Sequence, residues 1–104
     1  MKKIIKDLKT LQSNKFAPSC EVINKVLEIF QSLNIKIKNH PTIYCGDAHC
    51  ITIAFENTDF DFSADGKIVE ANTDDGVALL GTEFYIEYPN ELKKFKEFLV
   101  TELI

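Results

Sequence analysis

The hydrophobic and polar positions of this chain follow the helical period near both ends. Apolar residues recur three or four positions apart in three segments: 3–12, 20–33 and 91–103. Ser19 precedes the second segment as a good N-cap, and Pro89-Asn90 stops the preceding strand and caps the third. The pattern therefore predicts two amphipathic helices near the N-terminus and one near the C-terminus.

Between these helices the period changes to two, which is typical of strands with one buried face. Phe60 and Phe62 alternate with Asp59 and Asp61 just before an Asp-Gly turn signal at residues 64–66. Two strands are expected to pair around this turn: Asp59–Ser63 and Lys67–Ala71. We expect the two phenylalanines in the core and the two aspartates facing the solvent.

Four other segments alternate in the same way: 35–38, 42–45, 49–55 and 83–88. Residues 77–80 are expected to form a short buried strand or simply to fill part of the core. Apolar residues occupy odd positions up to Phe55 and even positions from Phe60, so one continuous strand cannot bury both sets. A turn or a bulge at residues 56–58 resolves this conflict, and we expect the turn because Asn and Thr suit it.

Polar segments and glycines separate the predicted strands. Residues 46–48 indicate a turn, residues 72–76 an acidic loop, and Gly81 an interruption of the strand pattern. One side of the last strand carries its apolar residues: Phe84, Ile86 and Tyr88. Helices grouped at both ends of a run of strands indicate an α+β fold. We expect one domain over residues 1–104, with two N-terminal helices, a largely antiparallel sheet of five or six short strands, and one C-terminal helix.

Composition indicates an ordinary globular domain. The 104 residues are 45% hydrophobic and 27% charged, which leaves room for a hydrophobic core. No apolar run reaches the roughly 20 residues needed to span a bilayer, and residues 1–12 lack the apolar stretch of a secretory signal. Three cysteines are too few for a disulfide scaffold and suit a reducing compartment, so we expect a cytoplasmic location without membrane contact.

Charge is distributed unevenly along the chain, although the net charge is only −4. Residues 1–46 contain eight lysines and three acidic residues, whereas residues 47–91 contain eleven acidic residues and a single lysine, Lys67. A surface built from the second region would repel nucleic acid and attract a basic protein surface. The alternative is a solvated β surface that charge keeps soluble and protects from edge-to-edge pairing.

One cluster has side chains that commonly bind zinc: His40, Cys45, Asp47, His49 and Cys50. Its spacing contains no C-x2-C pair, and the adjacent His49 and Cys50 would point to opposite faces of a strand, which disfavours a shared metal. The cysteines could also act as nucleophiles with a histidine as base, but the sequence supplies no visible oxyanion hole. We expect neither a metal nor catalysis here and keep the cluster as the alternative site.

Residues 61–72 match part of the spacing of an EF-hand calcium loop. Its positions 1, 3, 5, 6 and 8 correspond to Asp61, Ser63, Asp65, Gly66 and Ile68. Position 12 holds Asn72 instead of a bidentate glutamate, and the flanking residues alternate like strands. A hairpin turn explains the Asp-Gly pair without an ion, so no calcium site is expected.

The sequence offers few groups for catalysis or for nucleic-acid recognition. It contains no Gly-rich phosphate loop, no G-x-S-x-G elbow, no H-E-x-x-H motif and no arginine. Arginine is the leading base-reading side chain, so direct binding to nucleic acid is not expected. We therefore expect a protein that is not an enzyme and needs no cofactor.

These observations favour a small acidic protein-binding domain. Its partner is expected to be a basic protein, such as a nuclease or another nucleic-acid-binding effector, whose basic surface the domain masks as an inhibitor, an immunity protein or an antitoxin. The expected partner-binding residues are Asp59, Asp61, Asp74, Asp75, Glu83, Tyr85 and Glu87. One alternative is a metal-binding or Cys/His-dependent protein that uses the candidate zinc cluster of His40, Cys45, His49 and Cys50. Another is a subunit of a larger assembly.

Overall fold

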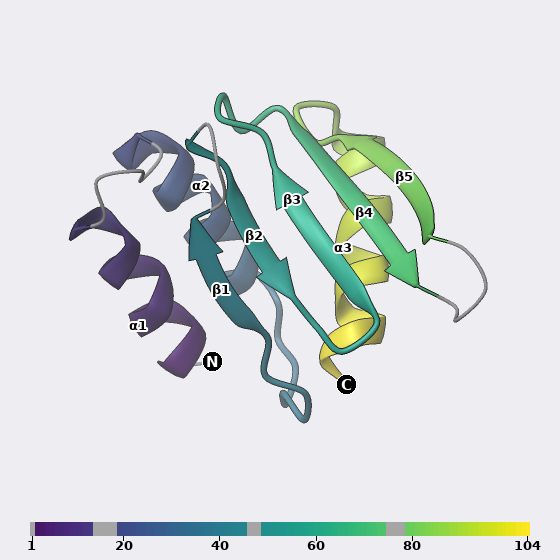
Figure 1. The fold of residues 1–104 in the computed structure, drawn as a ribbon, viewed down its shortest axis with the longest axis horizontal. Helices are drawn as coiled ribbons and strands as arrows, with labels where there is room; N and C mark the ends of the chain where they lie inside the picture. The colour runs from purple at the N-terminus through teal and green to yellow at the C-terminus, as the bar shows by residue number, and fades with distance from the viewer. Residues whose placement is uncertain (1, 14–18, 46–48, 75–78) are drawn as a thin grey trace.

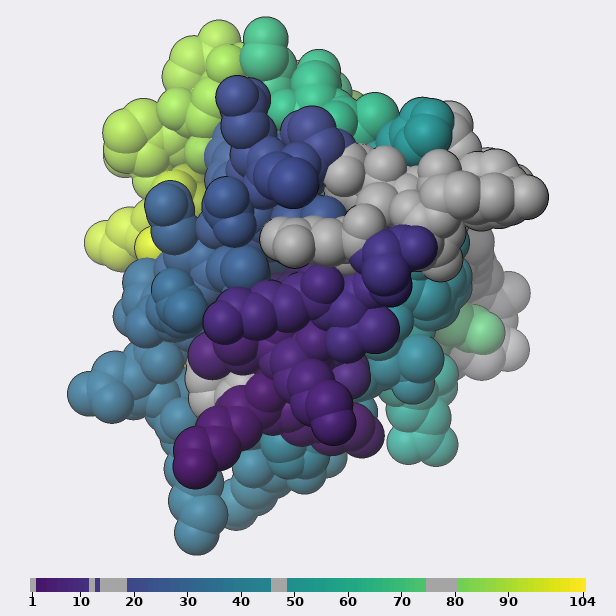
Figure 2. Space-filling view, turned by 90° about the vertical axis from the view of Figure 1, so that its left-hand side faces the viewer, coloured from purple at the N-terminus to yellow at the C-terminus, as the bar shows by residue number. Residues whose placement is uncertain are grey.

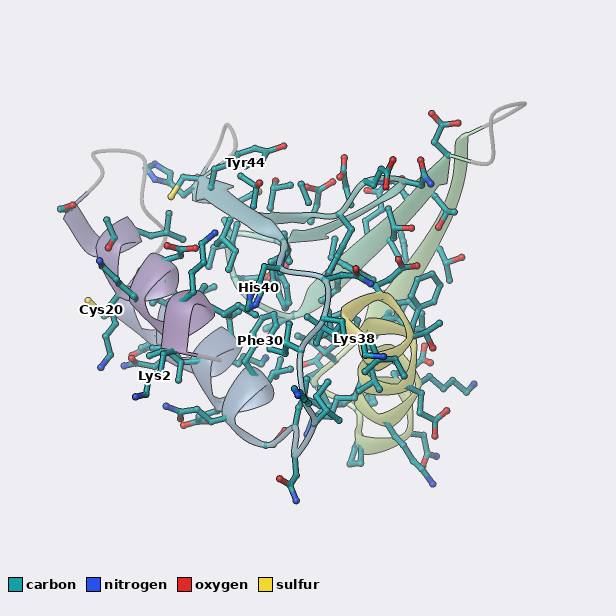
Figure 3. All side chains as sticks on the ribbon, turned by 90° about the horizontal axis from the view of Figure 1, so that it is seen from below. Lys2, Cys20, Phe30, Lys38, His40 and Tyr44 are labelled. Carbon is teal, nitrogen blue, oxygen red and sulfur yellow. The ribbon has the colours of Figure 1, made fainter. Side chains whose placement is uncertain are left out.

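The chain folds into two layers, a five-stranded sheet and a layer of helices that covers one face of it (Figures 1 and 3). The structure is a computed structural model that describes residues 2–13, 19–45, 49–74 and 79–104. The elements follow in this order: α1 (Lys2–Thr10), a short 3-10 helix η1 (Leu11–Ser13), α2 (Cys20–Gln31), β1 (Thr42–Cys45), β2 (Ile51–Ala54), β3 (Thr58–Phe62), β4 (Ile68–Asp74), β5 (Leu79–Tyr85) and α3 (Pro89–Leu103). The α+β prediction is confirmed, with three α-helices and five antiparallel strands in the described residues.

Each helix buries the apolar stripe that the sequence predicts. α2 begins after Ser19, whose hydroxyl accepts a hydrogen bond from the backbone N–H of Val22 at 3.4 Å. α3 begins at Pro89, a position where no intrahelical N–H is needed and the fixed φ suits a helix. Figure 2 shows α1 on the surface against α2, on the side of the molecule that carries β1. None of the helices in the described residues is long and apolar enough to cross a membrane.

The strands form a meander in which each strand pairs antiparallel with the next one along the chain. The predicted hairpin is confirmed as β3 and β4, with Phe60 and Phe62 paired to residues of β4. Gly66 in the connecting turn has a φ of 71°, a left-handed conformation that a side chain would strain. The predicted turn before β3 is also confirmed, because the N–H of Phe55 donates to the carbonyl of Thr58 at 2.8 Å.

An aromatic cluster joins the sheet to α3. Phe60 and Phe62 are 0% and 1% exposed, as the alternation predicts. Each of their rings lies 5.5 Å from the ring of Phe95 in an edge-to-face contact, and Phe84 of β5 lies 5.9 Å from the same ring. The cluster holds the helices on the phenylalanine side of the sheet, so the opposite side remains open.

The strand predicted over residues 35–38 is wrong, because this segment is an irregular connection between α2 and β1. The backbone N–H groups of Lys38 and Asn39 both donate at 3.0 Å to the carbonyl of Leu103, near the end of α3. The two isoleucines of the segment are partly buried against the core, which accounts for its alternating pattern. Its backbone bonds to a helix end rather than to a neighbouring strand, and a strand requires such a neighbour.

The acidic loop predicted over residues 72–76 is also wrong in its first half. Residues 72–74 belong to β4, where Asn72 pairs with Gly81 and Thr73 with Leu80 of β5. Gly81 therefore continues β5 instead of interrupting it. The turn predicted at 46–48, the rest of the acidic loop and the first half of the segment 77–80 lie outside the described residues.

Two other strands have different bounds from those predicted. β5 ends at Tyr85, so Phe84 and Ile86 are buried as expected but Tyr88 is 59% exposed. Tyr88 is the residue that precedes α3, where the chain leaves the sheet, and this departure turns its side chain out. The strand predicted over residues 49–55 covers only Ile51–Ala54.

Candidate functional site

The helices leave one face of the sheet open, and side chains project from it (Figure 3). The strand register sets these side chains in rows. One row crosses all five strands: Tyr44, Thr52, Asp61, Glu70 and Glu83. The adjacent row contains Thr42, Ala54, Asp59, Asn72 and Gly81. Successive residues of a strand point to opposite faces, so both rows lie opposite the buried phenylalanines.

Carboxylates dominate this open face. We call five residues the acidic face: Asp59 and Asp61 on β3, Glu70 and Asp74 on β4, and Glu83 on β5. None of the five strands contains a lysine. In contrast, α1 carries four lysines and α3 carries three. The open face of the sheet is therefore negative, whereas α1 and α3 together carry seven of the twelve lysines.

Asp61 lies near the centre of the acidic face and accepts two hydrogen bonds. Thr52 on β2 donates its hydroxyl to Oδ1 of Asp61 at 2.6 Å, and Asn72 on β4 donates Nδ2 to Oδ2 at 3.3 Å. Thr52 is only 6% exposed, so its hydroxyl depends on this acceptor. Asp61 is on the predicted side of the sheet, but it is half-buried instead of freely exposed. It therefore links three strands as well as contributing charge.

The surroundings raise the pKa values of two other residues on this face. Burial, and then the negative charge of Asp61, raises the pKa of Asp59 above its ordinary value. The hydroxyl of Tyr85 donates to Oε2 of Glu83 at 3.1 Å. This hydrogen bond and the charge of Glu83 raise the pKa of Tyr85, so the phenol keeps the proton with which it orients the carboxylate.

The structure brings most of the predicted partner-binding residues onto one surface. Five of the seven lie on the open face: Asp59, Asp61, Asp74, Glu83 and Tyr85. Glu87 follows the end of β5, and Asp75 lies outside the described residues. Sequence reasoning missed Glu70, whose alternation with the buried Val69 carried the signal. It also missed Tyr44, which only the pairing of β1 with β2 places in the same row.

The residues of the candidate zinc cluster do not all lie at the same end of β1. His40 precedes this strand and Cys45 ends it, a separation of roughly 15 Å for an extended chain. Among the described residues, no group of three or more His, Cys, Asp or Glu side chains is placed to hold a metal ion, and Asp47 lies outside them. Burial raises the pKa of Cys45, the opposite of what a nucleophilic thiolate needs.

Residues 61–72, which partly match an EF-hand calcium loop, belong to the β3–β4 hairpin. Oδ1 of Asp65 accepts hydrogen bonds from the hydroxyl of Ser63 at 2.6 Å and from the backbone N–H of Lys67 at 2.9 Å. The Ser63 bond first, and then the Lys67 bond, lower the pKa of Asp65. The Asp65 carboxylate is thus occupied by hydrogen bonds within the turn. Asn72, at the last position of the loop pattern, donates to Asp61 on the open face.

Comparisons of the chain with protein-family models, with curated proteins and with solved structures find no match. The function therefore has to be argued from the geometry and charge of the open face.

Proposed function

We propose that this chain is a cytoplasmic protein-binding domain whose acidic face covers the nucleic-acid-binding surface of a basic partner, as an inhibitor, an immunity protein or an antitoxin does. The observation that carries the proposal is the grouping of five carboxylates on one open sheet face whose strands contain no lysine. A basic groove binds nucleic acid mainly through phosphate charges, and a field of carboxylates supplies the same sign of charge.

Solubility is the competing explanation of the acidic face. A surface that serves only solubility usually mixes both signs of charge, whereas a large field of one sign steers association with a charged partner. This chain has twelve lysines, yet none of those in the described residues lies in a strand. The segregation of the charges therefore favours recognition over solubility.

Two tyrosines flank the carboxylates and supply apolar contact area. Tyr44 on β1 is 45% exposed and Tyr85 on β5 is 41% exposed. Tyrosine is enriched among the residues that dominate binding energy, because it buries a large rigid ring at low entropic cost. The acidic face would set the rate of association, and the tyrosines would slow dissociation.

The first experiment identifies what the acidic face contacts. Zero-length carbodiimide cross-linking in an extract of the native host joins carboxylates to lysines that touch them, and mass spectrometry locates each link. We expect links from Glu70 and Glu83 to lysines of a basic protein. Links confined to Glu21 and Glu28, which are exposed on α2, would place the binding surface on the helices instead.

The second experiment measures association with that protein by stopped flow at low and high salt. The double variant Glu70→Gln, Glu83→Gln should associate about tenfold more slowly at low salt and show a weaker salt dependence. The matched control is Glu21→Gln, Glu28→Gln, which removes the same charge from the helix side. Equal association rates for the two double variants would mean that the acidic face serves solubility alone.

A further inference from the structure

The strand order leaves one edge of the sheet open at β5. The opposite edge strand, β1, has α1 packed beside it, and Figure 2 shows α1 across the middle of that side. Among the described elements, none lies outside β5 (Figure 1). An open strand edge presents backbone donors and acceptors to which another chain can add a strand.

Hydrogen bonding identifies the backbone groups at this edge. The N–H of Ile86 donates to the carbonyl of Lys67 at 2.9 Å, and in an antiparallel pair such bonding alternates along the strand. Even-numbered residues of β5 therefore bond to β4, and the N–H and C=O groups of Gly81 and Glu83 point outward. The carbonyl of Tyr85 accepts from the N–H of Tyr88 at 3.1 Å, which leaves its N–H as the last outward donor before the turn into α3.

The two sides of this edge differ in chemistry: carboxylates dominate the open face, and phenylalanine rings contribute to the helix face. On the open face the outward positions carry Glu83 and Tyr85, with Glu70 opposite Glu83 on the next strand. On the helix face a hollow lies between β5 and α3. Phe84 and the partly buried Phe98 form its apolar part, and Lys94, Glu97, Thr101 and Glu102 of α3 complete its lining. A strand added to β5 would alternate between these two environments, because its side chains alternate between the faces.

We propose that β5 receives an extended segment of the basic partner as a sixth strand, in which basic and apolar side chains alternate. The basic side chains lie beside Glu70 and Glu83, and the apolar ones enter the hollow beside Phe98. This inference rests on the proposed function, because the acidic face supplies the charge that selects a basic segment. A second copy of this chain fits poorly, since antiparallel pairing of two β5 strands centred on Thr82 or Glu83 brings two Glu83 carboxylates diagonal or opposite to each other.

The probe is a blocked nine-residue peptide that alternates lysine with valine, added at low salt to the labelled protein. NMR hydrogen exchange should slow at the amides of Gly81 and Glu83 by at least about tenfold at saturation, since these donors become hydrogen-bonded. A lysine–glycine peptide of the same charge should shift resonances of the acidic face without slowing exchange at these amides. A glutamate–valine peptide should do neither.

Two variants at Gly81 provide a matched pair. Gly81→Pro removes the outward N–H and places a ring at the edge, where proline is tolerated because no ladder bond is lost. Gly81→Ala keeps the N–H. Both substitutions add a Cβ, which at this position lies 3.2 Å from Oδ1 of Asn72, so the two variants share this contact. The proline variant should bind the lysine–valine peptide about tenfold more weakly than the alanine variant. Equal affinities for the two variants, with both folded, would overturn the strand addition.

The outcomes separate this inference from the proposed function. Shifts at Asp61 and Glu70 with unchanged exchange at Gly81 and Glu83 would overturn the strand addition and leave binding by the acidic face intact. The absence of any shift with either lysine peptide would count against the acidic face itself. Equal protection by the glutamate–valine peptide would overturn the basic pattern assigned to the added strand.

Discussion

Replacement of Asp61 by alanine should destabilise the protein, although Asp61 lies on a face crowded with negative charge. The carboxylate accepts the Thr52 hydroxyl at 2.6 Å and the side-chain amide of Asn72 at 3.3 Å. Asp61→Ala removes both acceptors and also removes one charge from beside Asp59 and Glu70. The two effects on the free energy of unfolding have opposite signs, so their magnitudes decide the outcome.

The lost hydrogen bonds outweigh the relieved repulsion. Thr52 is 6% exposed, and a buried hydroxyl without a partner costs about 1–3 kcal/mol. The longer bond from Asn72 adds at most about 0.5 kcal/mol, since this amide is half-buried and water replaces the acceptor in part. Repulsion between neighbouring carboxylates at a solvated surface is worth less than about 1 kcal/mol. We expect a net loss of about 1–2 kcal/mol.

The assay is urea unfolding of a double-mutant cycle that pairs Asp61→Ala with Thr52→Val. Thr52→Val removes the buried donor and keeps the shape of the side chain, so Asp61→Ala in that background should cost less than about 0.5 kcal/mol. A coupling of about 1 kcal/mol between the two sites is therefore expected. If Asp61→Ala costs nothing in the native background, Asp61 is an ordinary surface charge and the reasoning fails. For this reason the association experiments use Glu70 and Glu83, whose replacement orphans no buried donor.

Three further predictions test the packing of the core, the raised pKa of Asp59 and the candidate zinc cluster. Phe62→Ala should cost about 3–5 kcal/mol by thermal or urea unfolding, because Phe62 is 1% exposed and packs on Phe95; a loss below 1 kcal/mol would contradict its place in the core. The raised pKa of Asp59 means that the folded state binds its proton more readily than the unfolded chain, so stability falls as the pH rises from its ordinary value of 3.8 through the raised one. Asp59→Asn should therefore be more stable than the parent at neutral pH, and urea titrations should show that this advantage disappears below pH 3.8. Elemental analysis should find no stoichiometric zinc, and one zinc ion per chain that is lost in the double variant Cys45→Ser, Cys50→Ser would refute this.

The helices and the central hairpin could be predicted from the sequence because their signals are local. The cap at Ser19 and the apolar stripe that follows it are contained within one segment, and so are the alternation of Phe60 with Asp61 and the turn at Gly66. In each case a few neighbouring residues specify both the conformation and the face that is buried.

The strand assignments failed where the outcome depended on a distant partner. The segment 35–38 alternates like a strand, but its backbone bonds to the carbonyl of Leu103, far along the chain. Residues 72–74 are polar like a loop, yet they pair with β5 and so extend the sheet. A strand is completed by its neighbour, and the identity of that neighbour is not contained in the period of one segment.

The features of the candidate site also fall into those set by local sequence and those set by long-range pairing. The sequence by itself determined that carboxylates would alternate with buried phenylalanines and that the acidic residues would be separated from most of the lysines. Only the tertiary structure decided that Tyr44, Glu70 and Glu83 lie in one row, that Asp61 is tied to Thr52, and that β5 is an open edge. Those features arise from the register of strands that come together only when the core closes, so their physical cause lies in the packing of the whole sheet.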